Sequence, residues 1–327
     1  MKRGKGFSRR EFLGASALIG GLAAFRPSLG LAQAKKRISI ATGGTGGVYY
    51  PYGGGMANVI SKYLPGVEAT AEVTSASVDN MKLVGAGKAD LALTMVDTAF
   101  DAAEGKEKFK NKEPIMTVAA LYTNFMHVTS LAGKGIKGVA DLKGRTVSTG
   151  SPNSGTEVMA LRILEAFGLN PEKDVKRDRL GVTESAGALK DGKIDAFFWV
   201  GGLPTAAILD LAATPGVTMS LVPHDEAVAK LSAKYGPIYF KETIPKTAYP
   251  HQTADTGVAA IANILVCNAK AEADFIYNVL KVFFEHQAEL VAVHKEAKNL
   301  TLEKAVKGSP VPFHPGAVKF FKEKGKM

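Results

Sequence analysis

The sequence RISIATGGTGGVYY at residues 37–50 passes from a strand-like pattern through a glycine-rich loop into a helical pattern. Alternating apolar residues predict a strand at its start, and apolar residues at helical spacing predict a helix from about Tyr50 to Tyr63. Another strand is expected over residues 67–74, then a helix, then a strand over residues 91–96. Strands that alternate with helices predict an α/β fold with parallel strands.

The same order of elements recurs about a hundred residues later, where RTVSTGSPNSGTEV at residues 145–158 again gives a strand, a loop and a helix start. In both copies a short Gly-Lys-x-Asp sequence precedes a further strand, and it ends at Asp90 and at Asp195. The first strand begins 53 residues before this aspartate in the first copy and 50 residues before it in the second. We therefore expect two lobes of one plan. The alternative is a chance likeness between two α/β units, because the shared sequence is short.

The later part of the chain carries proline-rich loops, a strand-like run over residues 258–267 and a helical pattern over residues 271–298. These elements lack a Gly/Ser loop of their own, so we expect the chain to return to the first lobe. Strands near residues 125–131 and 258–267 would then cross between the lobes and allow them to rotate about a cleft. The predicted division is lobe 1 at residues 35–125 plus 258–327, and lobe 2 at residues 126–257.

The N-terminus has the features of a twin-arginine export signal, with Arg9 and Arg10 ahead of a weakly apolar run. Small residues at Ala32 and Ala34 predict cleavage after Ala34 and a periplasmic location; an uncleaved anchor or a chance arginine pair is the alternative. Residues 1–34 hold six basic residues and one acidic residue, so cleavage lowers the formal net charge from +10 to +5. Basic residues in the remainder are dispersed among acidic ones, which argues against a nucleic-acid partner.

Three loops that lead into predicted helices offer free backbone N–H groups. They are a glycine-rich loop with Thr45, a Ser/Thr loop in which Ser77 is the expected N-cap, and the loop over residues 151–156. If they face one cleft, they bind an anion such as a carboxylate without any cationic side chain. Each also has a purely structural interpretation. Ser154 and Glu157 form a capping-box pattern, and we interpret Glu157 as structural.

Four aromatic residues follow expected strand ends or loops: Tyr49, Tyr50, Phe198 and Trp199. One or two of them would cover the apolar part of a ligand and supply a hydroxyl or indole donor, and ordinary core packing is the alternative. The lone cysteine, Cys267, lies in an apolar run and is expected to be buried.

Signals of catalysis are weak. The glycine-rich loop does not complete the dinucleotide pattern, and the chain has neither a Walker lysine nor a nucleophile elbow. The six histidines are scattered, so no metal and no cofactor are expected. Asp97 and Asp101 lie one helical turn apart and form a candidate carboxylate pair, although a helix cap explains Asp97 as well.

Five motifs taken together resemble the TAXI family of solute receptors for TRAP (tripartite ATP-independent periplasmic) transporters, in order along the chain after residue 34. They are TGGTGGVYYP at 42–51, GKAD at 87–90, GSPNSGTE at 150–157, GKIDAFF at 192–198 and HPGA at 314–317. The resemblance implies a type II periplasmic-binding-protein-like fold: two α/β lobes joined by two crossover strands, with a ligand cleft between. It also implies delivery of a ligand such as glutamate, 2-oxoglutarate or a related dicarboxylate to the membrane subunits of a TRAP transporter.

The resemblance further implies which residues meet the ligand. Those matched are Thr45, Val48, Tyr49 or Tyr50, Ser77, Asn80, Ser151, Ser154, Gly155 and Thr156. Trp199 joins this set from the aromatic residues described above. The sequence departs from the usual family pattern where Asn153 and Ala76 stand in place of glycine.

Two further functions stay open for the same cleft. Twin-arginine export often serves folded proteins that carry cofactors, which leaves a periplasmic enzyme as one alternative. A ligand sensor that reports to a membrane receptor is the other.

Overall fold

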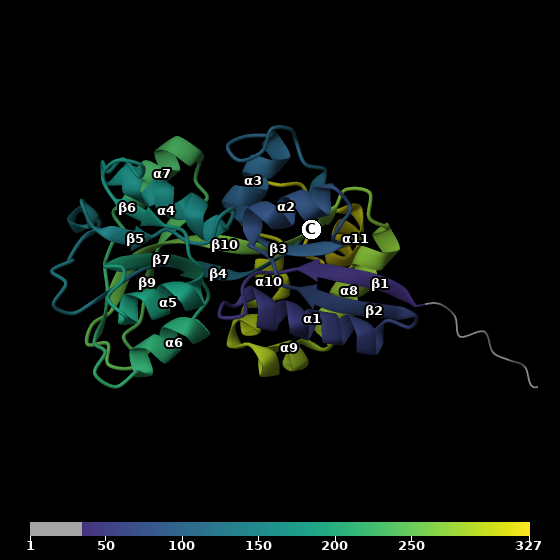
Figure 1. Ribbon diagram of the computed structural model, residues 1–327. Coiled ribbons are helices and arrows are strands. Elements are labelled where there is room, and N and C mark those ends of the chain that lie inside the picture. The colour runs from purple at the N-terminus through teal and green to yellow at the C-terminus, as the bar shows by residue number, and fades with distance from the viewer. Residues whose placement is uncertain (1–34) are drawn as a thin grey trace, which may run out of the picture. The chain divides into compact units, whose positions relative to one another are not determined.

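The computed structural model describes residues 35–327, which fold around one mixed sheet of ten strands with helices packed on its faces (Figure 1). The expected export signal at residues 1–34 lies outside the described residues. The order of the main strands is β2-β1-β3-β10-β4-β7-β5-β6, and β8 and β9 pair with β4 and β10. Among residues 35–327, no helix has the length and apolar character that crossing a membrane requires.

The first end of the sheet is built by residues 36–104, which contain the glycine-rich loop. In this end β1 lies between β2 and β3, and all three strands run parallel. Its elements are β1 (Lys36–Ala41), α1 (Tyr49–Tyr63), β2 (Val67–Glu72), α2 (Ser77–Gly85), β3 (Leu91–Met95) and α3 (Val96–Glu104).

The second end repeats this plan, because β5 lies between β6 and β7 and pairs parallel with both. The internal repeat in the sequence is therefore also a repeat of strand order. Its elements are β5 (Thr146–Ser148), α4 (Gly155–Ala166), β6 (Lys176–Asp178), α5 (Val182–Lys190), β7 (Ala196–Gly201) and α6 (Ala206–Ala213).

The two Gly-Lys-x-Asp sequences have the same structural role in both ends of the sheet. The Asp90 carboxylate accepts a hydrogen bond from the N–H of Ser39 at 2.9 Å, and the Asp195 carboxylate accepts one from the N–H of Thr146 at 3.0 Å. Gly87 and Gly192 open the two turns with φ of 68° and 73°, a region that favours glycine. Each aspartate therefore ties the start of one strand to its parallel neighbour.

Two long antiparallel strands, β4 (Ile115–Leu131) and β10 (Thr256–Asn268), join the two ends of the sheet. β10 also pairs with β3 of the first end, and β4 also pairs with β7 of the second. The predicted crossover strands are thus the central pair of the sheet, and the predicted lobe boundaries, after residues 125 and 257, fall inside them. The second end also contains β8 (Met219–Leu221), α7 (Ala227–Tyr235) and β9 (Tyr239–Ile244), and a 3-10 helix, η1 (Val139–Leu142), follows β4.

The C-terminal segment returns to the first end of the sheet, where it packs on α1 and β4 (Figure 1). The prediction of one helix over residues 271–298 is wrong, because the chain turns at His286. The ring of His286 stacks on Tyr63 of α1 with 3.4 Å between centroids, so a contact with α1 fixes the turn. The elements are α8 (Ala273–Glu285), α9 (Gln287–Val293), the 3-10 helix η2 (Lys295–Asn299), α10 (Leu302–Ala305) and α11 (Pro315–Glu323).

A buried ionic cluster joins α3 of the first end to α4 of the second. Arg162 donates to Asp97 at 3.3 Å and to Asp101 at 2.5 Å, and it also donates to the hydroxyl of Tyr239 at 2.7 Å. The three charged residues are at least nine-tenths buried. Asp97 and Asp101 are therefore a carboxylate pair, as one interpretation of the sequence had it, but both bind the same arginine, and the cluster joins the two ends of the sheet.

Candidate functional site

A cavity of about 180 Å³ lies where the carboxyl ends of the parallel strands from both ends of the sheet meet. This edge is the usual ligand position in open α/β sheets. The cavity is smaller than the roughly 300–1,000 Å³ of sites for drug-sized ligands, so it suits a small metabolite. Its lining comes from three segments of the first end, residues 43–44 with 47–49, residues 74–77 and residue 95, and from four of the second, residues 150–151, residues 154–156, residues 180–182 with 184, and residues 199–201.

Four helices begin at the cavity: α1, α2, α4 and α5. Their N-cap residues are Val48, Ala76, Ser154 and Gly181, and only Ser154 caps its helix with a side chain. The other three helices leave first-turn N–H groups without a side-chain cap. Since each helix start also carries partial positive charge, the cavity favours a negatively charged group.

Charged side chains contribute little to the lining. Among the described residues that form it, Glu184 is the only carboxylate, and no lysine or arginine takes part. Positive potential in the cavity therefore comes from backbone dipoles and not from side-chain cations. That the loops bind an anion through these groups remains a prediction.

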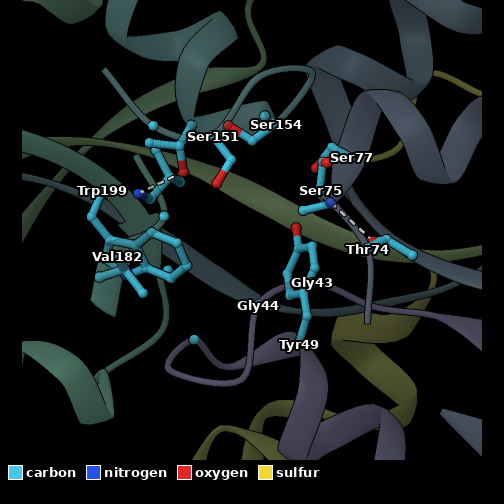
Figure 2. A pocket seen from close by; sticks show the side chains of 18 of the residues that line it. Gly43, Gly44, Tyr49, Thr74, Ser75, Ser77, Ser151, Ser154, Val182 and Trp199 are labelled. Carbon is cyan, nitrogen blue, oxygen red and sulfur yellow. Dashed lines mark hydrogen bonds between the residues drawn. The ribbon is translucent and has the colours of Figure 1, made fainter. Parts of the chain in front are cut away.

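Tyr49 is the main side chain that enters the cavity from the first end. Figure 2 shows its ring rising from the start of α1, with the hydroxyl directed toward Ser75 and Ser77. Burial raises the pKa of Tyr49 far above its usual value, although the nearby side chains of Ser77 and Asn124 oppose the shift. The hydroxyl therefore stays protonated and is able to donate a hydrogen bond.

Ser77 is not the N-cap that the sequence predicted. It is the first residue of α2, and its hydroxyl accepts a hydrogen bond from the N–H of Met95 at 3.2 Å. The N-cap is Ala76, with φ of 78°, and Asn153 on the opposite loop has φ of 63°. These are the two positions where the sequence departs from the glycine of the TAXI pattern, and a positive φ is unfavourable for Ala76 but is tolerated by an asparagine such as Asn153.

The second end contributes a row of hydroxyl groups. The Ser154 hydroxyl accepts from the N–H of Glu157 at 3.0 Å, and the Thr156 hydroxyl accepts from the N–H of Val200 at 3.3 Å. The Ser151 hydroxyl points toward the middle of the cavity (Figure 2). Ser151 is thus the hydroxyl of this loop best placed to meet a ligand.

Glu157 is structural, as the sequence analysis proposed. Its carboxylate is fully buried and pairs with Arg177 at 3.2 Å and with Arg179 at 2.5 Å. It also accepts from the N–H of Asn153 at 3.1 Å, one residue before the helix cap. The capping-box pattern is therefore completed on the Ser154 side, while the glutamate holds the loop in front of it.

The structure brings eight of the predicted ligand residues to the cavity and leaves three outside its lining. Those that line it are Val48, Tyr49, Ser77, Ser151, Ser154, Gly155, Thr156 and Trp199. Thr45 and Tyr50 are exposed, because the loop and the first turn of α1 direct them outward. Asn80 is fully buried below the loop, where its amide donates to the carbonyl of Thr42 at 2.7 Å and to that of Leu93 at 2.8 Å.

Sequence reasoning missed the segment from Leu180 to Glu184, which forms the start of α5 and part of the cavity wall. The internal repeat carries the signal that would have found it. The loop from Thr74 to Ser77 follows β2 and begins α2, and the missed loop follows β6 and begins α5 in the same way. Both loops reach the cavity because they occupy equivalent places in the two ends.

Trp199 forms a wall of the cavity on the side of the second end (Figure 2). The expectation that its indole N–H donates to a ligand is corrected by the structure, because this group donates to the hydroxyl of Thr205 at 2.9 Å. What Trp199 offers the cavity is therefore the surface of its ring.

Comparison with known proteins gives one family and a set of similar folds. A profile described as the NMT1-like family matches residues 40–325. The structure is similar to an ancestral arginine-binding protein bound to arginine, with a TM-score of 0.51, 13% identity, and coverage of 80% of this chain and 98% of that one. This likeness shows the type II periplasmic-binding-protein fold, as the sequence predicted.

Two sulfonate-binding proteins are similar at lower scores. The alkanesulfonate-binding protein SsuA from Xanthomonas axonopodis pv. citri, bound to MOPS, has a TM-score of 0.49 and 14% identity, with coverage of 88% of this chain and 84% of that one. The periplasmic aliphatic sulphonate binding protein SsuA from Escherichia coli has a TM-score of 0.46 and 14% identity, with coverage of 88% and 83%.

Proposed function

Because this chain belongs to the NMT1-like family, we propose that it is an exported solute-binding protein that captures a small organic anion. We further propose that it is the TAXI-type receptor of a TRAP transporter, with glutamate, 2-oxoglutarate or a related dicarboxylate as ligand. The observation that carries the proposal is the meeting of four helix N-termini at one cavity without a lining lysine or arginine.

The geometry supports an anion because several weak contributions add up at one place. A negative charge at one helix N-terminus gains roughly 0.3–1 kcal/mol, and up to about 2 kcal/mol where it is partly buried. Here two helix starts belong to the first end of the sheet and two to the second. A carboxylate reaches its full set of donors only when both ends face it, so binding favours the closed arrangement.

Contacts across the cleft support closure as part of the mechanism. The N–H of Ala207 donates to the carbonyl of Gly46 at 3.3 Å, and the N–H of Val78 donates to the carbonyl of Asn153 at 3.2 Å. Each bond joins a loop of one end of the sheet to the first turn of a helix of the other end, α6 for Ala207 and α2 for Val78. We infer that the ends rotate about β4 and β10 to admit the ligand and close over it by forming these bonds.

The lining also favours binding without a covalent step. Among the described residues that form it there is no histidine, cysteine or lysine to serve as a nucleophile or general base. Glu184 is the one carboxylate in this lining, and among the described residues no hydrogen bond joins it to a serine or threonine hydroxyl that it would have to activate. This supports a binding protein over the alternative of a periplasmic enzyme in the same cleft.

The proposal is tested by a thermal-shift screen of the purified protein against L-glutamate, 2-oxoglutarate, succinate and L-glutamine. A dicarboxylate present at about one hundred times its Kd is expected to add about 2.7 kcal/mol to the free energy of unfolding. Ser151→Ala is expected to weaken the response, and Ser61→Ala, at an exposed position on α1, is the matched control. Binding of L-glutamine alone, or turnover of any of these compounds, would count against the proposal.

The membrane partner needs a separate test, since the assignment to a TRAP system depends on the five sequence motifs. We expect the protein to support ligand uptake by vesicles that contain TRAP membrane subunits and an ion gradient, without ATP. Uptake that instead requires ATP hydrolysis by a partner subunit would identify a transporter of the ABC type.

A further inference from the structure

Trp199 is the only tryptophan in the chain, and it lies in the wall of the cavity. Its ring approaches the first end of the sheet closely, since a Cβ atom built on Gly47 would lie 2.7 Å from the ring atom Cη2. The indole therefore fills the narrow space between the glycine-rich loop and β7. Its orientation decides both the shape of the cavity and the approach of the two ends.

A network of hydrogen bonds between buried side chains holds this indole on the side that faces away from the cavity. The Trp199 N–H donates to the Thr205 hydroxyl at 2.9 Å, and the N–H of Thr205 donates to the Tyr249 hydroxyl at 3.1 Å. The Tyr249 hydroxyl lies 2.9 Å from Nε2 of His127, whose Nδ1 lies 3.0 Å from the carbonyl of Phe125. His127 and Thr205 are fully buried and Tyr249 is 3% exposed.

Each N–H and O–H hydrogen in this network has only one possible acceptor. A backbone carbonyl only accepts, so Nδ1 of His127 carries the proton and Nε2 accepts from the Tyr249 hydroxyl. An indole N–H only donates, so the Thr205 oxygen accepts from Trp199 and donates its own hydrogen to the carbonyl of Gly202 at 3.0 Å. A network with a single arrangement of hydrogens gives Trp199 one orientation.

Burial keeps the network in this protonation state. Loss of hydration lowers the pKa of His127 to about 4, against the opposing effect of its backbone hydrogen bonds. Burial also raises the pKa of Tyr249 to about 12. Both side chains are therefore neutral near pH 7.

The Thr205 hydroxyl takes part in this network and does not cap a helix. It is the N-cap of α6, a position where a threonine hydroxyl normally accepts from an N–H of the first helical turn. Here no side-chain cap forms, because the hydroxyl is turned to Trp199 and Gly202. A cap typically contributes about 1 kcal/mol, so the local sequence alone does not explain this arrangement.

We propose that His127, Tyr249 and Thr205 are positioning residues of the ligand site, which fix the ring of Trp199 as a rigid wall of the cavity. The network begins on β4, one of the two strands about which the ends rotate, so it also ties the wall to the hinge. This inference rests on the proposed function only for the effect on ligand affinity. The orientation of Trp199 is a property of the protein without ligand.

The test uses Thr205→Val, which removes the acceptor of the indole N–H and keeps a branched side chain. Because Trp199 is the only tryptophan, its fluorescence reports on this one indole. In the ligand-free variant we expect lower fluorescence anisotropy and an acrylamide quenching constant about twofold higher, as for a side chain that has gained mobility. Thr129→Val is the matched control, since Thr129 is fully buried on the same strand as His127 and its hydroxyl has no hydrogen-bond partner among residues 35–327.

A second set of variants guards against misfolding. Tyr249→Phe breaks the network at its middle and is expected to give the same fluorescence change. His127→Gln retains one donor and one acceptor and is expected to restore wild-type quenching, whereas His127→Leu is not. Wild-type fluorescence in folded Thr205→Val and Tyr249→Phe would overturn the proposal, as would an equal effect of Thr129→Val.

Ligand titrations with L-glutamate and 2-oxoglutarate separate this inference from the proposed function. Loss of one hydrogen bond behind Trp199 is expected to weaken binding about tenfold in Thr205→Val. If neither compound binds the wild-type protein, the proposed ligand class is wrong, and the fluorescence comparison still decides the network. If the wild type binds and Thr205→Val binds equally well despite a mobile indole, Trp199 is not a positioned wall of the site.

Discussion

Asp101 is a buried carboxylate whose charged form is disfavoured by its surroundings. Burial raises its pKa to about 6; Arg162 opposes this shift, while Asp97 and Glu107 reinforce it. The cluster thus holds two carboxylates for one guanidinium, and one of the two is readily protonated. Removing one partner of a buried ion pair usually costs more than the pair contributes, so the balance of charge in this cluster decides its effect on stability.

A pH prediction follows from Asp101. Its folded-state pKa is above its unfolded value, so its contribution to stability is fully present below about pH 4 and is lost as the pH rises through 6. We expect the stability of the wild type relative to Asp101→Asn to increase by about 1 kcal/mol between pH 7.5 and pH 5. Urea unfolding of both proteins at the two pH values measures this difference.

The comparison with Asp101→Asn is needed because other groups act in the opposite direction. Burial lowers the pKa of His127 and of His224 to about 4, so both histidines reduce stability as the pH falls below their unfolded values. They are present in both proteins and cancel in the difference. A stability difference that does not change with pH would contradict the assignment of a raised pKa to Asp101.

For single residues, the sequence predicted hydrogen bonds between residues that are close together in the chain. Ser154 accepts from Glu157 three residues later, a local pattern that the sequence shows directly. The partners of Asp97 and Trp199 were not predicted in the same way. Arg162 is 65 residues from Asp97, and the donor to Thr205 was expected to face the ligand, because nothing local to Trp199 shows that its N–H is already used.

At the scale of elements, the two aspartates that start β3 and β7 are the clearest sign of the repeat. Asp195 has a second partner that Asp90 lacks in the described structure, since Lys134 donates to it at 3.1 Å. Burial opposes ionisation of Asp195, but the N–H of Thr146 and the Lys134 ammonium lower its pKa below the usual value. The same motif is therefore held more strongly in the second end.

This difference predicts unequal effects of equivalent substitutions. Asp195→Ala removes a charged acceptor at a half-buried position and is expected to cost about 1.5–3 kcal/mol. Asp90→Ala acts at an exposed position and is expected to cost about 1 kcal/mol or less. Urea unfolding of both variants checks the order. Asp195→Asn keeps an acceptor oxygen and serves as the control, and a larger cost for Asp90→Ala would contradict the explanation.

The break between α8 and α9 shows why one element was predicted wrongly. The apolar spacing from Phe275 to Leu290 continues through His286, so the sequence alone favours one helix. The turn is set by α1, where Tyr63 stacks on His286 and Gly55 leaves room for Val293. Helix ends that depend on a partner far along the chain have no signal of their own.

In the molecule as a whole, a close contact in the cleft limits how far the two ends of the sheet approach each other. Gly47 faces the Trp199 ring, and a Cβ atom there would lie 2.7 Å from it. Gly44 lines the same cavity from the same loop, and a Cβ atom there would meet nothing within 4 Å. Alanine substitutions at the two glycines add the same methyl group to the same loop, but only the one at Gly47 would obstruct closure of the cleft.

We expect Gly47→Ala to hold the cleft partly open and to weaken ligand binding by about tenfold or more, since overpacking at such a contact costs about 1–3 kcal/mol. Gly44→Ala is expected to close as the wild type does. Small-angle scattering with and without ligand measures closure, and thermal unfolding verifies that both variants are folded. Ligand-induced compaction of Gly47→Ala equal to that of the wild type would contradict the role assigned to this glycine.

The sequence by itself determined the alternation of strands and helices, the repeat of strand order and the helix-starting loops that carry backbone donors. These depend on residues close together in the chain, where apolar spacing, glycines and caps act directly. Only the tertiary structure decided which loop residues face the cavity, that Asn80 lies beneath it, and that Trp199 is held from His127 through Tyr249. His127 and Tyr249 are 122 residues apart, and such partners meet only because strand pairing and the approach of the two ends bring them together.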